Sequence, residues 1–114
     1  MIDPHAQSRF RHILEAIREI EGFTQEGEPV FRASLMAQRA VLYDLLVIGE
    51  AARTLTPEAR STCPDVPWNR VVGLRNILTH EYFKVDIEVV WGIVHRHLPL
   101  LKTQIEAALR DASA

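Results

Sequence analysis

Residues 34–55 read SLMAQRAVLYDLLVIGEAARTL, and this stretch decides what kind of fold the chain can adopt. Ser34 is a typical residue to precede a helix, because its hydroxyl can accept a hydrogen bond from a free backbone N–H of the first turn. The residues that follow include no proline and a single glycine, Gly49, so little opposes a helix before about Leu55. The sequence therefore predicts a long helix over residues 34–55.

This predicted helix is apolar on two sides. On a wheel of about 100° per residue, a broad apolar sector and a second, separate one are present. The first holds Val41, Leu42, Leu45, Leu46, Ile48 and Ala52, and the second holds Met36, Ala40, Tyr43 and Val47. A helix of one four-helix bundle needs a single apolar sector, so the second must be buried against something else. A symmetric copy of the chain is the commonest partner, which predicts a homodimer. The alternative is that residues 23–33 fold over the second sector.

Three further helices are predicted, over residues 5–22, 67–80 and 86–111. Their apolar residues recur three and four apart, as expected for amphipathic helices. Their boundary signals are Gly22 after the first, Pro67 at the first position of the second and Asp86 as a cap of the third. Pro99 should kink or divide the last helix near His97. No alternating run indicates a strand, so we expect an all-α fold, an antiparallel bundle of four to five helices.

The composition indicates one ordinary globular domain spanning residues 1–114. At 13.0 kDa, with 47% hydrophobic and 25% charged residues, the chain can bury a core without metals or disulfides. It has no apolar run of the roughly 20 residues that a membrane span requires, no start typical of a secretory signal, and only one cysteine, Cys63. We therefore expect a cytoplasmic protein that does not contact membranes. The formal net charge of −2 argues against coating of nucleic acid by bulk charge, so any polyanion must be bound locally.

Residues 75–83, RNILTHEYF, place an arginine, an asparagine, a histidine and a tyrosine within eight positions of a stretch that is otherwise patterned as a buried helix. The buried arc of this helix is expected to consist of Val71, Leu74, Ile77 and Leu78. Arg75 falls on the flank of that arc, where an unpaired charge would cost several kcal/mol. It therefore needs an acidic partner, a phosphate or a water-filled cleft.

Two spacings within this stretch bear on chemistry. Asn76 and His80 are four residues apart on one edge of the helix, so we expect the amide to orient the imidazole. Arg75 and His80 are five apart, or roughly 140° around a regular helix. They can act on one substrate only if the helix ends near His80 or if two chains contribute to one site. The predicted dimer would meet this requirement.

An arginine that binds phosphate oxygens, beside a ring that titrates near neutrality, matches the needs of RNA cleavage. A base removes the proton of the 2′-hydroxyl, this oxygen attacks the adjacent phosphorus, and an acid protonates the leaving 5′-oxygen. A fixed cation stabilises the charge that builds on the phosphorane. Two histidines, one from each chain, would divide the acid and base roles. The reaction needs no metal or other cofactor, and the sequence contains no zinc-ligand spacing.

Each residue also has a purely structural interpretation, because Arg-x4-His is a short pattern. Arg75 can pair with Asp44 or Glu50 across the bundle. His80 can be a cation favoured at a helix C-terminus, and Tyr82 can close the rim of the core. Cys63 has no cationic neighbour in the sequence, so we expect an unreactive thiol.

The stretch RNILTHEY resembles the Arg-x4-His-x-Tyr signature of HepT-like proteins, a branch of the HEPN superfamily. Four segments resemble that family in the same order and at similar separations. They are ILEAIREIEGFT, IGEAARTLTPEAR, VPWNRVVGLRNILTHEYFKVD and LPLLKTQIE, and they span almost the whole chain. The resemblance implies an all-α homodimer with an active cleft at its interface. It also implies a metal-independent endoribonuclease, the toxin of a type VII toxin–antitoxin pair.

The resemblance also implies roles for individual residues and for partners. Arg75 and His80 would be catalytic, and Asn76 would be the polar residue that follows the arginine. The partners would be RNA and an Mnt-type nucleotidyltransferase antitoxin, which silences the toxin by transferring AMP to Tyr82. One alternative is a non-catalytic helical module that docks such an enzyme and is modified by it. Another is a bundle that binds a small molecule and presents it to that enzyme.

Overall fold

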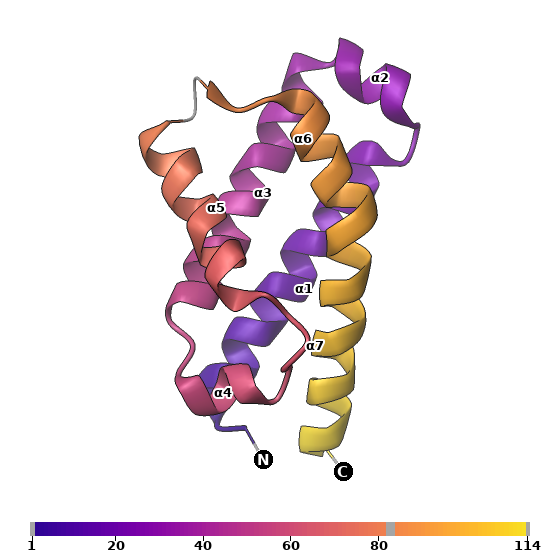
Figure 1. Cartoon of the computed structure of the whole chain (residues 1–114). Coiled ribbons are helices and arrows are strands. Elements are labelled where there is room, and N and C mark those ends of the chain that lie inside the picture. The colour runs from indigo at the N-terminus through magenta and orange to yellow at the C-terminus, as the bar shows by residue number, and fades with distance from the viewer. Residues whose placement is uncertain (1, 82–83, 114) are drawn as a thin grey trace.

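The computed structural model describes residues 2–81 and 84–113, and every regular element among these residues is helical (Figure 1). The elements are α1 (Pro4–Thr24), α2 (Glu28–Ala33), α3 (Leu35–Arg53), α4 (Pro57–Ser61), α5 (Trp68–His80), α6 (Ile87–Gly92), the π-helical turn η2 (Ile93–His97) and α7 (Leu98–Ser113). The all-α prediction is confirmed, and the four long predicted helices are present. None of the described helices combines the length and apolar composition needed to cross a bilayer.

The helix starts follow the local sequence signals. Ser34 caps α3, because its side chain accepts a hydrogen bond from the backbone N–H of Ala37 at 3.1 Å. Asp3 does the same for α1, where its carboxylate accepts from the N–H of Ala6 at 2.8 Å. The predicted stop at Gly22 is wrong, since α1 continues to Thr24. The chain turns instead at Gly27, whose φ of 96° lies in the left-handed region that favours glycine.

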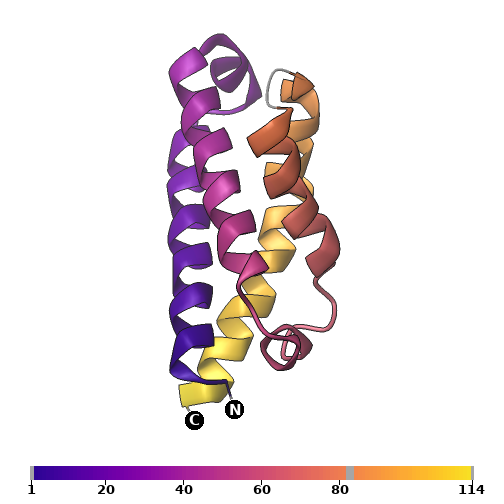
Figure 2. The same cartoon turned by 90° about the vertical axis from the view of Figure 1, so that its left-hand side faces the viewer.

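The core lies between α1, α3 and the C-terminal helices. Its largest fully buried side chains are Phe10, Phe31, Ile13, Ile17, Ile20, Leu45, Ile48, Ile105, Val41, Val90 and Cys63. Helix α3 packs against α1 on one side and against α5 on the other, and Figure 2 shows these three helices side by side. The first apolar sector of α3 supplies the buried contacts, as predicted.

The second apolar sector of α3 is only partly buried: Met36 and Tyr43 remain on the surface, whereas Ala40 and Val47 are half-buried. Residues 23–33 do not cover it, so that alternative is wrong. They form a turn and α2, which buries Phe31 but leaves Met36 and Tyr43 83% and 66% exposed. Helix α2 is not among the predicted helices. Its Pro29 lies in the first turn, where no N–H is needed.

The C-terminal helical segments follow one another without a break in the ribbon (Figure 1). The predicted division near His97 takes the form of the wider turn η2, which ends at that residue. Pro99 has no N–H and its ring crowds the carbonyl four residues earlier, so a locally wider turn accommodates it without a sharp kink.

Candidate active site

Helix α5 carries the described motif residues, and its two ends are held differently. At its start, Trp68 is buried and its indole N–H donates to the carbonyls of Arg60 and Cys63 at 3.1 and 3.2 Å. Towards its end, Leu78 is buried, but Ile77 is 47% exposed, so the expectation that Ile77 belongs to the buried arc is wrong. One side of α5 therefore faces α3, and the other side is more open to solvent than the sequence pattern indicates.

Arg75 projects from α5 towards α3, where its Nε donates to a carboxylate oxygen of Glu50. Glu50 also accepts from Nη2 of Arg53 at 3.3 Å. Hydrogen bonds from Arg53 and then from Arg75 hold the pKa of the Glu50 carboxyl below its ordinary value. Of the two acidic partners that the sequence offered Arg75, the structure therefore selects Glu50.

The other acidic candidate, Asp44, faces α1 instead. It is buried, and burial together with a hydrogen bond to Glu19 and the charges of Glu19 and Glu15 raises its pKa to about 7. Such a carboxyl group is easily protonated. Asp44 therefore belongs to the contact between α1 and α3 and does not pair with Arg75.

Gly49 explains why Arg75 and Glu50 lie so close. A β-carbon at position 49 would overlap the β-carbon of Arg75 and lie 3.1 Å from its α-carbon. The backbones of α3 and α5 can approach this closely only because position 49 has no side chain. The neighbouring Glu50 is thereby held within reach of the guanidinium. The sequence shows Gly49 as a lone glycine inside a long predicted helix, but this signal does not by itself reveal the packing role.

Asn76 has a different partner from the one predicted. Its amide oxygen accepts from Nη1 of Arg75 at 3.0 Å. The expected contact between Asn76 and His80 is wrong, since no hydrogen bond joins them in the structure. The guanidinium of the adjacent residue takes the amide oxygen, and the amide NH2 has no hydrogen bond in the described part of the chain. Asn76 therefore orients the arginine.

His80 is the last residue of α5, and its side chain is exposed. Within the described part of the chain, its ring has no recorded hydrogen bond or ion pair. Arg75 and His80 differ in surroundings, because the first is held at the junction with α3 and the second is open to solvent at the helix end. Tyr82, the expected modification site, lies outside the described residues.

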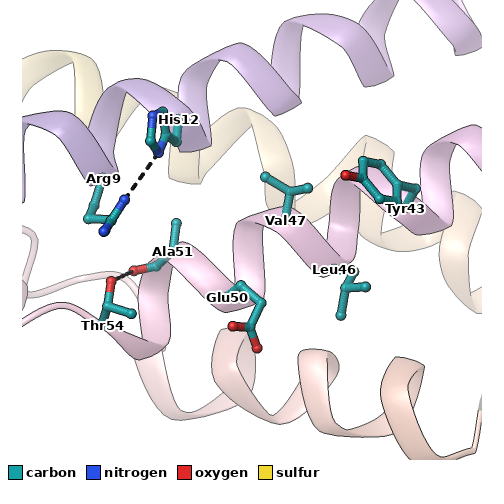
Figure 3. A pocket seen from close by; sticks show the side chains of 8 residues that line it. All are labelled: Arg9, His12, Tyr43, Leu46, Val47, Glu50, Ala51 and Thr54. Atoms are coloured by element: carbon teal, nitrogen blue, oxygen red, sulfur yellow. Dashed lines mark hydrogen bonds between the residues drawn. The ribbon is translucent and has the colours of Figure 1, made fainter.

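A groove between α1 and α3 was not predicted (Figure 3). It lies next to the ion pairs that Glu50 forms with Arg53 and Arg75. It has a volume of about 400 Å³ and is lined by Arg9, His12, Tyr43, Leu46, Val47, Glu50, Ala51 and Thr54. Glu50 therefore lines the groove and also contacts Arg75. Arg9 and His12 lie far from the motif in the chain, and only the packing of α1 on α3 brings them near Glu50.

Cys63 is fully buried, and burial raises the pKa of its thiol. Its sulfur donates to the carbonyl of Gln104 at 3.5 Å. Both the burial and the raised pKa disfavour the thiolate, in line with the prediction of an unreactive thiol.

Comparison with known proteins adds to this geometry. The family model described as "Ribonuclease HepT-like" matches residues 13–108. "Putative RNase MJ1380" of Methanocaldococcus jannaschii is 39% identical over 95 residues, which cover 82% of this chain and 87% of that relative. "Probable ribonuclease HepT" of Thermococcus cleftensis is 37% identical over 95 residues, with 82% and 86% covered. "Putative RNase TTE0752" of Caldanaerobacter subterraneus is 32% identical over 103 residues, with 87% and 89% covered. No solved structure matches the chain.

Proposed function

This chain belongs to the HepT-like ribonuclease family, and we propose that it is a metal-independent endoribonuclease in which Arg75 and His80 are the catalytic residues. The observation that carries the proposal is the state of Arg75. Its Nε is held by Glu50 and its Nη1 by Asn76, while Nη2 has no recorded partner in the described part of the chain. Two acceptors thus orient the guanidinium, and Nη2 remains as a donor for a phosphate oxygen.

The proposed reaction is an internal transesterification followed by release of the downstream RNA. One His80 imidazole takes the proton of the 2′-hydroxyl, and the 2′-oxygen forms a bond to the adjacent phosphorus. The bond from phosphorus to the 5′-oxygen breaks, and that oxygen takes a proton from a second, protonated His80. The products are a 2′,3′-cyclic phosphate and a 5′-hydroxyl end. Arg75 stabilises the extra negative charge on the phosphorane between these steps.

A second His80 has to come from a second chain, so the proposal includes a homodimer with a shared site. The second apolar sector of α3 supports this, because Met36, near the start of the helix, is 83% exposed. Burial of such a surface stabilises an association between identical chains. The separation of roughly 140° between Arg75 and His80 on a regular helix also favours contributions from two chains.

The experiment that tests the proposal is cleavage of single-stranded RNA by the purified protein in excess EDTA. We expect products that end in 2′,3′-cyclic phosphate. We also expect the cleavage rate per chain to fall on dilution, in step with a change in mass from twice 13.0 kDa to 13.0 kDa. Cleavage that requires added metal, or a monomer with the full rate per chain, would contradict the proposal.

The proposal extends to regulation as the toxin of a toxin–antitoxin pair. A cognate nucleotidyltransferase would transfer AMP to the hydroxyl of Tyr82, two residues beyond His80 in the sequence. The oxygen attacks the α-phosphorus of ATP, the bond to the β-phosphate breaks, and pyrophosphate leaves. The attached phosphate would add bulk and negative charge close to the catalytic residues, and Arg75 could bind it in place of RNA.

We predict that Tyr82→Phe keeps RNA cleavage but escapes silencing when the protein is co-expressed with the nucleotidyltransferase. The change removes only the acceptor oxygen and keeps the aromatic ring. Intact-mass spectrometry should show additions of AMP to the parent and none to the variant. The chain has one other tyrosine, Tyr43, and Tyr43→Phe is the matched control that should still acquire AMP. Adducts that persist in Tyr82→Phe would contradict this assignment.

A second candidate function is a non-catalytic module that docks a nucleotidyltransferase. The ion pair between Arg75 and Glu50 favours it, because a carboxylate on the guanidinium competes with a phosphate. Absence of cleavage by the parent protein, together with a stable complex with the nucleotidyltransferase, would select this candidate.

A further inference from the structure

We propose that the groove between α1 and α3 is a second phosphate-binding subsite, in which Arg9 and His12 hold a phosphodiester of the RNA that flanks the cleaved bond. This inference rests on the proposed function, since it extends the path of the same substrate. The groove has a volume of about 400 Å³, which is within the range of sites for small ligands.

The guanidinium of Arg9 lacks the partner that its charge requires. Its Nε is buried without a hydrogen bond, and its Nη1 lies 3.5 Å from Nδ1 of His12, at the outer limit for such a bond. No carboxylate pairs with Arg9 in the described part of the chain. Arg60 also has a buried Nε without a partner, but its Nη2 donates to the carbonyl of Ala52 at 3.1 Å, and Arg60 does not line the groove. Arg9 is thus poised for an anionic ligand.

The charge balance of the groove also favours an anion. Glu50 is the only carboxylate among the eight lining residues, and it is already paired with Arg53 and Arg75. Arg9 therefore adds a positive charge to the groove, where the negative charge of Glu50 is already neutralised. A phosphodiester meets this need, and phosphate contacts position a strand without reading its sequence.

The position of Glu50 connects this subsite with the proposed catalytic centre. Figure 3 shows Arg9 and His12 on α1 at one end of the groove, with Tyr43 at the other end and Glu50 on α3 turned towards α5. Between these ends, the apolar side chains of Leu46, Val47 and Ala51 can accept a ribose or a base face. A strand bound at Arg75 would therefore continue over α3 into the groove.

The test measures RNA binding separately from RNA cleavage. In a His80→Ala background, the affinity for a fluorescein-labelled oligouridylate is measured by anisotropy at several salt concentrations. Arg9→Gln should weaken binding by about tenfold and lower the salt slope by about 1. Arg9→Lys should keep most of the slope. Arg11→Gln is the matched control, because Arg11 is exposed on the same helix and does not line the groove. Its one side-chain hydrogen bond within the described residues is to Gln7, at 3.5 Å.

The possible outcomes separate this inference from the proposed function. In the cleaving parent, Arg9→Gln should raise KM with little change in kcat, since the subsite binds the ground state and the transition state alike. Equal affinities for Arg9→Gln and Arg11→Gln would overturn the subsite. A change in oligomeric mass without a change in RNA affinity would also overturn it and identify the groove as a protein interface. If the parent binds RNA through Arg9 but never cleaves it, the subsite stands and the nuclease proposal fails.

Discussion

Replacing His80 with alanine is expected to reduce RNA cleavage by at least 10³-fold, an estimate of roughly 10²- to 10⁴-fold for each proton transfer that is lost. In the proposed dimer, one substitution removes both the base and the acid, since each chain supplies one of them. The fold should not be affected, because the His80 side chain is exposed at the end of α5 and has no recorded partner in the described part of the chain.

The measurement is the single-turnover rate on a defined RNA in EDTA, together with thermal unfolding of each variant. His97→Ala is the matched control, because His97 is an exposed histidine on the turn η2, outside the motif. It should cleave like the parent. A His80→Ala protein that retains the parental rate, or a His97→Ala protein that loses it equally, would show that His80 has no catalytic role.

Replacing Arg75 with alanine is the second change with a large expected effect. The rate should fall by about 10² to 10³, because the guanidinium acts when charge builds on the phosphorane. The effect on stability should be much smaller. The side chains of Arg75 and Glu50 are 26% and 40% exposed, and a half-exposed ion pair of this kind contributes roughly 0–1 kcal/mol. A large loss of kcat with a nearly unchanged unfolding temperature is therefore the expected combination.

Arg53→Ala is the control that isolates this role. Arg53 contacts the same carboxylate of Glu50, so its removal disturbs the ion-pair network but leaves Arg75 in place. It should unfold much like Arg75→Ala and cleave RNA much like the parent. If Arg75→Ala unfolds the protein and the parent never cleaves RNA, Arg75 serves only as an ion-pair partner, and the docking function becomes the better proposal.

The sequence by itself determined where the four long helices lie and which side chains can face a core. Ser34 and Asp86 cap helices as expected, because a capping hydrogen bond involves residues only two or three positions away. The two apolar sectors of α3 also follow from residue spacing alone. In the structure, Met36 and Tyr43 of the second sector are exposed and can contact a partner. The Arg-x4-His pattern of Arg75 and His80 can likewise be identified from the sequence.

Only the tertiary structure decided which groups those residues meet. Spacing places Arg75 on the flank of α5, but the choice of Glu50 over Asp44 depends on how α3 is rotated between α1 and α5. That rotation follows from packing, and the close approach at Gly49 is part of it. For the same reason, the sequence could not reveal the groove of Arg9 and His12. Contacts between residues far apart in the chain are set by how whole helix surfaces fit together, and no local pattern records that fit.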